Sequence, residues 1–308
     1  MTRNQLLQAF DKIRVWQQGD KRAPHKPLLV LLALGRVQRG EPTLVKFSSI
    51  DAPLKALIDE FGPSGAGKNR HFPFWHLASD GHGAVWHVEG PSRILDRPRG
   101  ATPTLTELRQ FDVSAGFPAA VQDALKRDPD LLQEVARRIL NAHFPETLHS
   151  DILAGVGLSL VGGDKVMSSQ AECPPRNRDP KFRERVLRAY EYRCCVCGYD
   201  LRLGQQTIGL EAAHIKWFQA GGPDIEQNGL SLCALHHKIF DLGAFTVQPD
   251  DFRVVFSQHV SGHDATGQAL LSRQGMKILQ PQSNDYWPEA DYLEWHQEQV
   301  FKRPARSF

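Results

Sequence analysis

The sequence predicts an α+β protein of two domains, in which a helix-rich N-terminal domain precedes a C-terminal domain organised around bound metal. The chain has 308 residues, about twice the roughly 150 residues of a typical single domain. Segments with helical spacing dominate the first half, whereas four of the five cysteines cluster in one stretch of the second half. A segment rich in turn formers separates the two halves.

Composition and charge place few limits on the function. With 41% hydrophobic and 23% charged residues, the composition is that of an ordinary soluble globular protein. No apolar run reaches the ~18 residues that a membrane span needs, and no apolar signal-peptide segment follows Met1. We therefore expect a cytoplasmic protein with no membrane partner. The net charge of +2 does not by itself indicate a nucleic-acid binder.

The N-terminal domain, residues 1–160, is expected to consist mainly of helices. Helical spacing of apolar residues predicts helices at residues 3–17, 27–37, 51–61, 119–125 and 130–144. Short runs rich in aromatic and β-branched residues predict two strands, at 72–77 and 84–88.

The remainder of the chain is expected to form a linker and a second domain. Residues 161–178 are rich in turn formers and poor in apolar residues, as is typical of a linker. The second domain then covers residues 179–308, with its core at 190–247. Within it, the pattern predicts helices at 182–192 and 289–301 and a hairpin made of 244–247 and 252–256.

Four residues of the C-terminal domain have the spacing of a zinc site. Cys194 and Cys197 form a C-x-x-C pair, and Cys233 and His236 form a C-x-x-H pair. Two such gaps allow four ligands to converge tetrahedrally on one zinc ion. The sequence therefore predicts a structural Zn²⁺ bound by these four residues, with Cys195 left over.

A second set of polar residues lies within this zinc frame. It comprises Glu211-Ala-Ala-His214, then Gly221-Gly-Pro-Asp224, then Asn228-Gly-Leu, then His236-His237 with Asp241 four residues later. In its order and spacing the pattern resembles the HNH nucleases, whose ββα-metal fold hydrolyses the phosphodiester backbone of DNA. The resemblance implies an HNH endonuclease domain with a structural zinc.

The resemblance implies a role for each member of a catalytic triad. His214 is placed to act as the general base, because a neutral imidazole can accept a proton near pH 7. Asn228 would hold the loop that positions His214, and His237 would bind a catalytic divalent cation, Mg²⁺ or Mn²⁺. The adjacent His236 should point about 100° around the helix, toward the zinc.

The second ligand of the catalytic cation is left open by the sequence. Many HNH relatives carry a metal ligand directly before the base, where this chain has Ala213. Glu211 and Asp241 are the candidates for that role. Each of them could equally be an exposed or a helix-capping residue.

Two segments of the N-terminal domain carry another resemblance. Residues 22–36 read Arg-Ala-Pro-His-Lys-Pro followed by an apolar run, and residues 72–77 read Phe-Pro-Phe-Trp-His-Leu. Ahead of an HNH domain, they resemble the sulfur-binding domain of modification-dependent restriction endonucleases, which recognise DNA whose backbone carries a phosphorothioate. The resemblance implies double-stranded, phosphorothioated DNA as the partner.

The chemistry of sulfur suggests how such a domain would work. Sulfur is larger and less hydrated than oxygen, so a shallow apolar cup favours it over a strongly solvated oxygen. Phe72 and Pro73 could form this cup, at a position where relatives often have Tyr-Pro, or could be core residues, as we expect for Phe74 and Trp75. His25 could instead cap its helix. Candidates for contacts to phosphates or bases are Arg22, His25, Lys26, Lys68, Asn69 and Arg70, or alternatively Arg93, Arg97 and Arg99.

The two resemblances together imply a type IV-like restriction endonuclease that recognises phosphorothioated DNA and cuts nearby. One alternative is an HNH endonuclease directed at methylated or hydroxymethylated DNA, which would flip the modified base into an aromatic cage. Another is a non-catalytic, zinc-stabilised DNA-binding regulator, whose sequence should lack His214 or His237. With one active site per chain, a double-strand break implies either a homodimer or two successive nicks, and we expect the homodimer on symmetry grounds.

Overall fold

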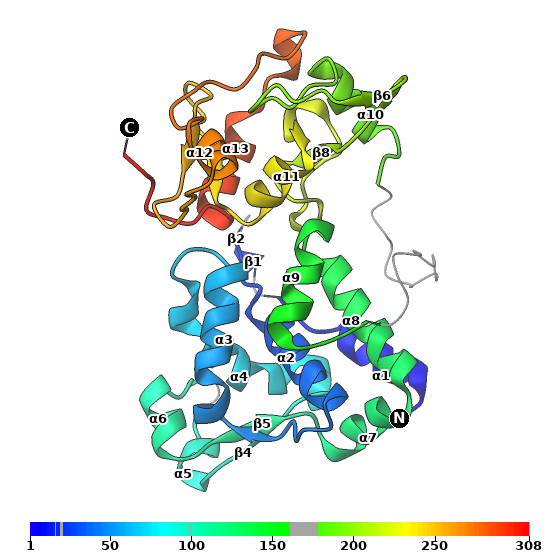
Figure 1. Cartoon of the computed structure of the whole chain (residues 1–308). Coiled ribbons are helices and arrows are strands. Elements are labelled where there is room, and N and C mark those ends of the chain that lie inside the picture. The colour runs from blue at the N-terminus through cyan, green and yellow to red at the C-terminus, as the bar shows by residue number, and fades with distance from the viewer. Residues whose placement is uncertain (16, 19–20, 99, 161–177, 308) are drawn as a thin grey trace. The chain divides into compact units, whose positions relative to one another are not determined.

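The computed structural model of the chain describes residues 1–15, 17–18, 21–98, 100–160 and 178–307. Contacts divide the chain into two compact units, Met1–Cys173 and Pro174–Phe308 (Figure 1). The expected linker at 161–178 lies outside the described residues, apart from Arg178. Among the described helices, none has the length and apolar character that crossing a bilayer requires.

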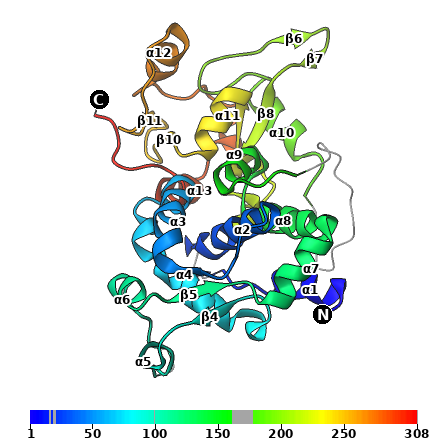
Figure 2. The same cartoon turned by 60° about the horizontal axis from the view of Figure 1, so that its bottom comes forward.

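Helices pack around one buried helix in the N-terminal unit. Residues Pro27 to Gly35 of helix α2 (His25–Gln38) are all apolar, so the helix has apolar side chains on nearly every side, and all of these residues are buried. A helix that is apolar on all sides has to be enclosed by others, and α2 lies in the middle of its unit (Figure 2). The helices that contact it are α3 (Phe47–Phe61), α4 (His71–His76), α7 (Ala119–Arg127), α8 (Pro129–His143) and α9 (Glu146–Val156).

The remaining elements of this unit are short. A three-stranded antiparallel sheet has the order β3 (Val45–Lys46), β5 (Ser114–Gly116), β4 (His87–Glu89). A second antiparallel pair joins β1 (Gln17–Gln18) to β2 (Lys21–Arg22). The other helices are α1 (Arg3–Asp11), α5 (Ser92–Leu95) and α6 (Leu105–Gln110). This unit is therefore mainly helical, as the sequence predicted.

The expected strand at 72–77 is wrong, since these residues belong mostly to helix α4. Pro73 is tolerated there because the first N–H groups of a helix have no partner within it. Packing outweighs the strand preference of the aromatic residues: Phe74 is fully buried and meets Phe47 and Trp86 edge to face. Trp75, which we also expected in the core, is only partly buried.

The C-terminal unit is built around a two-stranded sheet and two short helices. Strand β8 (Leu210–His214) pairs antiparallel with β9 (Gly229–Cys233), and His214 lies opposite Gly229. Both strands contact helix α10 (Phe182–Ala189) and helix α11 (Ala234–Asp241). The other elements are β6 (Arg202–Leu203), β7 (Gln206–Thr207), β10 (Phe245–Val247), β11 (Val254–Phe256), α12 (Ala265–Leu271) and α13 (Ala290–Gln299).

Most expected elements are present, with shifted ends. The hairpin at 244–256 is confirmed by the pairing of β10 with β11. The helix expected at 182–192 ends at Ala189, because Glu191 and Tyr192 have φ angles of 53° and 56° that an α-helix does not allow. Helices α5, α6, α9 and α12 were not predicted.

Candidate active site and metal centre

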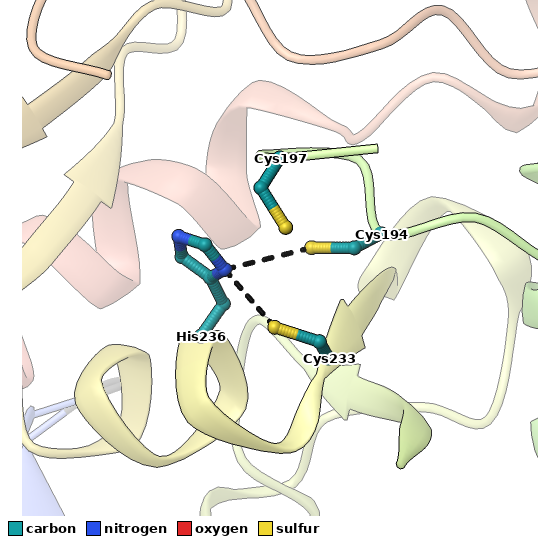
Figure 3. Close-up of side chains that lie close together, drawn as sticks. All are labelled: Cys194, Cys197, Cys233 and His236. Atoms are coloured by element: carbon teal, nitrogen blue, oxygen red, sulfur yellow. Dashed lines mark hydrogen bonds between the residues drawn. The ribbon is translucent and has the colours of Figure 1, made fainter. Parts of the chain in front are cut away.

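Four potential zinc ligands meet at one point of the C-terminal unit (Figure 3). Cys194 and Cys197 come from the loop after α10, whereas Cys233 ends β9 and His236 lies in the first turn of α11. Their ligand atoms all lie within 4.8 Å of one another, and His236 Nδ1 is 3.1 Å from Cys233 Sγ and 3.7 Å from Cys194 Sγ. Neighbouring ligands of a tetrahedral zinc ion are about 3.5–3.8 Å apart, so these four residues fit zinc.

The electrostatics of this cluster also suit a cation. Hydrogen bonds from the thiols of Cys194 and Cys233 lower the pKa of Cys197. Burial acts to lower the pKa of His236, but hydrogen bonds with Cys197 and Cys233 raise it to about 9. Negative charge is therefore favoured on the sulfur of Cys197, whereas hydrogen bonds with Cys197 and Cys233 raise the pKa of Cys194. Thiolates are the ligands that zinc selects. Cys195 is buried in the hydrophobic core and does not belong to the cluster.

A histidine held between two carboxylates lies directly after His236 on helix α11. His237 Nδ1 is 2.6 Å from Glu211 Oε2, and His237 Nε2 is 3.2 Å from Asp241 Oδ2. Burial acts to lower the pKa of His237, but Asp241 and Glu211 raise it to about 10. The Glu211 side chain is 44% exposed, whereas that of Asp241 is 2% exposed. Of the two carboxylates, Glu211 is therefore open to solvent and Asp241 is enclosed.

The other catalytic histidine candidate has a carboxylate partner of its own. His214 is the last residue of β8, and its Nε2 lies 2.7 Å from Asp224 Oδ1. The Phe182 ring stacks on the imidazole at 4.1 Å and 18°. Burial lowers the pKa of His214 below its ordinary value, although Asp224 acts in the opposite direction. The ring is therefore neutral at pH 7 and able to accept a proton.

The side chain of Asn228 ties together the loop that connects β8 to β9. It is fully buried, and its Oδ1 accepts a hydrogen bond from Lys216 N at 2.8 Å. Its Nδ2 donates to Lys216 O at 3.0 Å and to Pro223 O at 2.9 Å. The loop is so tight that a Cβ on Gly222 would lie 1.8 Å from Lys216 O. Asn228 therefore sets the shape of the chain between His214 and Asp224.

The sequence predicts His214, Asn228 and His237 as catalytic residues, but it does not predict the part played by Asp224. The signal lies in Gly221-Gly-Pro-Asp224, a part of the motif for which the sequence predicts no separate role. A carboxylate ten residues after the histidine has no regular spacing to reveal the contact. The turn that Asn228 holds brings Asp224 back to His214.

One exposed aromatic side chain stands out in the N-terminal unit. Phe72 is 42% exposed, although the neighbouring Pro73 is buried. Two imidazole rings flank it, with centroid distances of 4.3 Å to His71 and 6.1 Å to His76. Of the two residues expected to form the cup, only Phe72 therefore offers a broad apolar face to solvent.

The expected DNA contacts near this aromatic side chain occupy different environments. Lys26 Nζ donates to Asp80 at 2.6 Å and keeps 17% of its side chain exposed. Burial lowers the pKa of His76, and the charge of Lys26 acts in the same direction. His25 does not cap its helix: it is 9% exposed, and its Nε2 lies 3.0 Å from Ala66 O. The side chain of Arg22 lies outside the described residues.

The two basic residues expected in the loop before α4 differ in accessibility. Lys68 is exposed. Arg70 is 8% exposed and forms an ion pair with Asp51, which also binds Arg109. A guanidinium held in this way supports the loop from inside, whereas Lys68 can reach a partner.

Comparison with known proteins identifies both domains. Residues 3–161 match the family model of the ScoMcrA-like DNA sulfur-binding domain, and residues 194–248 match the HNH endonuclease model. A search of the curated proteins found no significant relative.

Several solved structures resemble the N-terminal part of the chain. "Sulfur binding domain of ScoMcrA complexed with phosphorothioated DNA" is 24% identical, with a TM-score of 0.43, and the match covers 49% of this chain and 94% of that one. A second structure, which also contains the SRA domain of ScoMcrA, is 25% identical over 49% of this chain and 46% of that one, with a TM-score of 0.44. A match to "Structure of the Type IV phosphorothioation-dependent restriction endonuclease ScoMcrA" is 23% identical, with a TM-score of 0.41, and spans 51% of this chain but 28% of that one. The two family models, not these superpositions, identify the domains.

Proposed function

Because the chain belongs to the family of the ScoMcrA-like DNA sulfur-binding domain and also carries an HNH endonuclease domain, we propose that it is a restriction endonuclease that recognises phosphorothioated DNA and hydrolyses phosphodiester bonds nearby. The observation that carries this proposal is the presence of a sulfur-binding and a cutting domain in one chain. Residues 1–160 are proposed as the recognition domain, 161–178 as the linker and 179–308 as the nuclease.

Hydrolysis requires a base for water and positive charge for the leaving 3′ oxygen. We assign the first role to His214, which is supported by its lowered pKa. A divalent cation, Mg²⁺ or Mn²⁺, would supply the charge stabilisation when bound. The residues that would hold it are Glu211 and His237, because a half-exposed carboxylate lies 2.6 Å from His237 Nδ1.

Asp241 is better suited to orienting His237 than to sharing its cation. It approaches Nε2, the nitrogen opposite the one that meets Glu211. Its burial also keeps it from substrate. A carboxylate behind a metal-binding imidazole fixes which nitrogen carries the proton and leaves the other free for the ion.

The cluster of Cys194, Cys197, Cys233 and His236 is proposed to bind a structural zinc ion. In structural sites four protein ligands close the coordination sphere, which leaves no position for substrate. Zinc would thus join the loop after α10 to the junction of β9 and α11, the helix that carries His237.

For sulfur recognition we propose the surface around Phe72. A phosphorothioate presents an anion together with a weakly hydrated sulfur, so it needs a cation beside an apolar face. Phe72 offers the apolar face, and Lys26, whose side chain is 17% exposed beside Asp80, offers the charge. Pro73 would fix the first turn of α4. Lys68 and Arg22 are proposed to contact flanking phosphates, with His25 and Arg70 supporting the surface from inside.

The proposal is tested by comparing two duplexes of the same sequence, one of which carries a phosphorothioate of natural chirality. Both are incubated with the protein and Mg²⁺ or Mn²⁺, in several sequence contexts. We expect cleavage of the sulfur-bearing duplex alone, and no cleavage by His214→Ala. Equal cleavage of both duplexes, or preferential cleavage of methylated DNA, would refute sulfur recognition. An absence of any cleavage in duplexes that the protein binds would favour a DNA-binding regulator.

Two further properties follow from this function. A double-strand break needs two cuts, so we propose a homodimer that brings one nuclease domain to each strand. Since the substrate is DNA, we also propose that the protein acts in the cytoplasm.

A further inference from the structure

We infer that Asp224 is a positioning residue for cleavage, which fixes the tautomer and orientation of His214 so that Nδ1 is the atom that accepts the proton of water. The inference rests on the proposed role of His214 as the general base. It adds to the proposed triad of His214, Asn228 and His237 a fourth residue, for which the sequence predicted no separate role.

The Asp224 carboxylate is held from two sides. Its Oδ1 lies 2.7 Å from His214 Nε2, and its Oδ2 accepts a hydrogen bond from Asp179 N at 2.7 Å. The backbone carbonyl of Asp224 accepts another from Arg185 Nη2 at 2.5 Å. The side chains of His214 and Asp224 are 15% and 12% exposed. Both groups are therefore largely removed from water and fixed relative to one another.

This contact determines which nitrogen of His214 carries the proton. An ionised carboxylate can only accept hydrogen bonds, so Nε2 has to be the N–H nitrogen of the neutral ring. Nδ1 is then left with its lone pair, and it has no hydrogen-bond partner among the described residues. The stacked ring of Phe182 restricts rotation of the imidazole. The other charges that act on the ring are those of Arg178 and Asp241.

In the reaction, one O–H bond of water breaks and its proton passes to Nδ1 of His214. The water oxygen bonds to phosphorus, and the bond from phosphorus to the 3′ oxygen breaks, with its electron pair remaining on that oxygen. His214 becomes an imidazolium beside the carboxylate of Asp224, which stabilises the positive charge. Asp224 keeps its own charge throughout, as in other carboxylate–histidine pairs.

The fold explains how Asp224 reaches His214. Asn228 Nδ2 donates to Pro223 O, directly before Asp224, and Asn228 Oδ1 accepts from Lys216 N, two residues after His214. One buried amide therefore binds the chain next to both members of the pair. Asn228 thus positions the base in two ways. It fixes the chain just after His214, at the end of β8, and it fixes the chain just before Asp224.

The test compares Asp224→Asn, Asp224→Ala and a matched control, Glu226→Gln, in the full-length protein. Glu226 lies two residues away and forms its ion pair with Arg185 at 3.1 Å, so this variant removes the same charge from the same loop. In Asp224→Asn the amide oxygen can keep the bond from Asp179 N, which turns the NH₂ group toward Nε2. That arrangement forces the proton onto Nδ1 and blocks the base.

We expect Asp224→Asn to lower kcat for cleavage by a factor on the order of 10²–10⁴, the usual contribution of a general base, with unchanged DNA binding. Asp224→Ala should lose no more than Asp224→Asn, because alanine does not impose the wrong tautomer. In ¹⁵N spectra of protein labelled at histidine, the Nε2–H form of His214 should give way to the Nδ1–H form only in Asp224→Asn. The acidic limb of kcat/KM should also move to lower pH in Asp224→Ala, because the charge that raises the pKa of His214 is lost.

The outcomes separate this inference from the proposed function. Normal cleavage by His214→Ala would refute the base and with it the role of Asp224. If His214→Ala is inactive but Asp224→Asn keeps the wild-type rate and tautomer, the inference alone is refuted. A loss in Asp224→Ala that greatly exceeds the loss in Asp224→Asn would indicate a merely structural role, since asparagine preserves more of the hydrogen bonds. An equal loss in Glu226→Gln would do the same.

Discussion

The two histidines assigned to cleavage, His214 and His237, lie in opposite electrostatic environments. Around His214, burial outweighs its single carboxylate partner and lowers the pKa. Around His237, two carboxylates outweigh burial and raise the pKa to about 10. A general base such as His214 has to be neutral at the working pH. The two carboxylates around His237 instead favour a positive charge on or beside its ring, either a proton or a metal ion. The surroundings of the two residues therefore match different roles.

The pKa of His214 predicts the acidic limb of the pH profile. A base works when deprotonated, so a pKa below the ordinary 6.5 keeps His214 active at lower pH. We expect the acidic limb of kcat/KM to have its midpoint below pH 6.5, measured on a cleaved duplex at saturating divalent cation. Zinc content is determined at each pH as a control. A midpoint above 6.5 at full zinc content would contradict this prediction.

A second prediction at this scale concerns the stability contributed by Asn228. Asn228→Ala removes three hydrogen bonds and leaves Lys216 N and two carbonyl groups without this partner in a buried loop. We expect a loss on the order of 2–4 kcal/mol in the free energy of unfolding of the C-terminal unit. Urea denaturation measures it, with Gln227→Ala as the control, since Gln227 makes one exposed bond to Asp285 O. Equal losses in both variants would contradict the assigned role.

Functional residues could be predicted where they recur at a characteristic spacing along the sequence. Cys194 with Cys197, and Cys233 with His236, are each three positions apart, and their spacing indicates a ligand set directly. The pairing of His214 with Asp224 depends on the course of a loop, and that of Arg70 with Asp51 joins residues nineteen positions apart. Neither leaves a periodic signal in the sequence.

At the scale of elements, the proposed zinc cluster adds a link between a loop and a short helix. The loop containing Cys194 and Cys197 has no helix or strand of its own, and α11 has only eight residues. The loop is also tied to β9, because Cys195 N donates to Ser231 O at 2.8 Å and Cys194 and Cys195 are buried in the core. Of the helices around α2, three (α3, α7 and α8) were predictable because burial repeats along them, whereas α9 was not predicted. The residues of α4 were not, since six residues with three aromatic rings fit a strand equally well until Phe74 meets Phe47 and Trp86.

Removal of zinc should therefore unfold the C-terminal unit selectively. Binding free energy of a structural zinc contributes directly to folding. We expect one zinc ion per chain by elemental analysis, and a strong chelator should lower the melting temperature of the C-terminal unit. Cys233→Ser should do the same, whereas Cys195→Ser, outside the cluster, should retain the metal. Acidification should release zinc because protons compete for the thiolates. Full zinc retention by Cys233→Ser would contradict the ligand set.

At the scale of the whole molecule, the residues proposed for recognition and those proposed for cleavage belong to different units. Phe72 and Lys26 lie in the N-terminal unit, whereas His214 and His237 lie in the C-terminal one. Each unit has its own hydrophobic residues and its own polar site. A change that disturbs one function should therefore leave the other measurable, which makes the two halves of the proposal separable by experiment.

The last prediction uses this separation. Phe72→Ala removes an exposed ring, so it should preserve folding and zinc content but reduce the preference for phosphorothioated over plain duplex by about tenfold, or ~1.4 kcal/mol of binding free energy. His214→Ala should abolish cutting yet keep the full binding preference. Both are measured by competition binding of the two duplexes, with Leu95→Ala, another exposed apolar residue of the same unit, as the control. If Phe72→Ala keeps the preference, sulfur contacts another part of the surface; if His214→Ala loses it, recognition is not confined to the N-terminal unit.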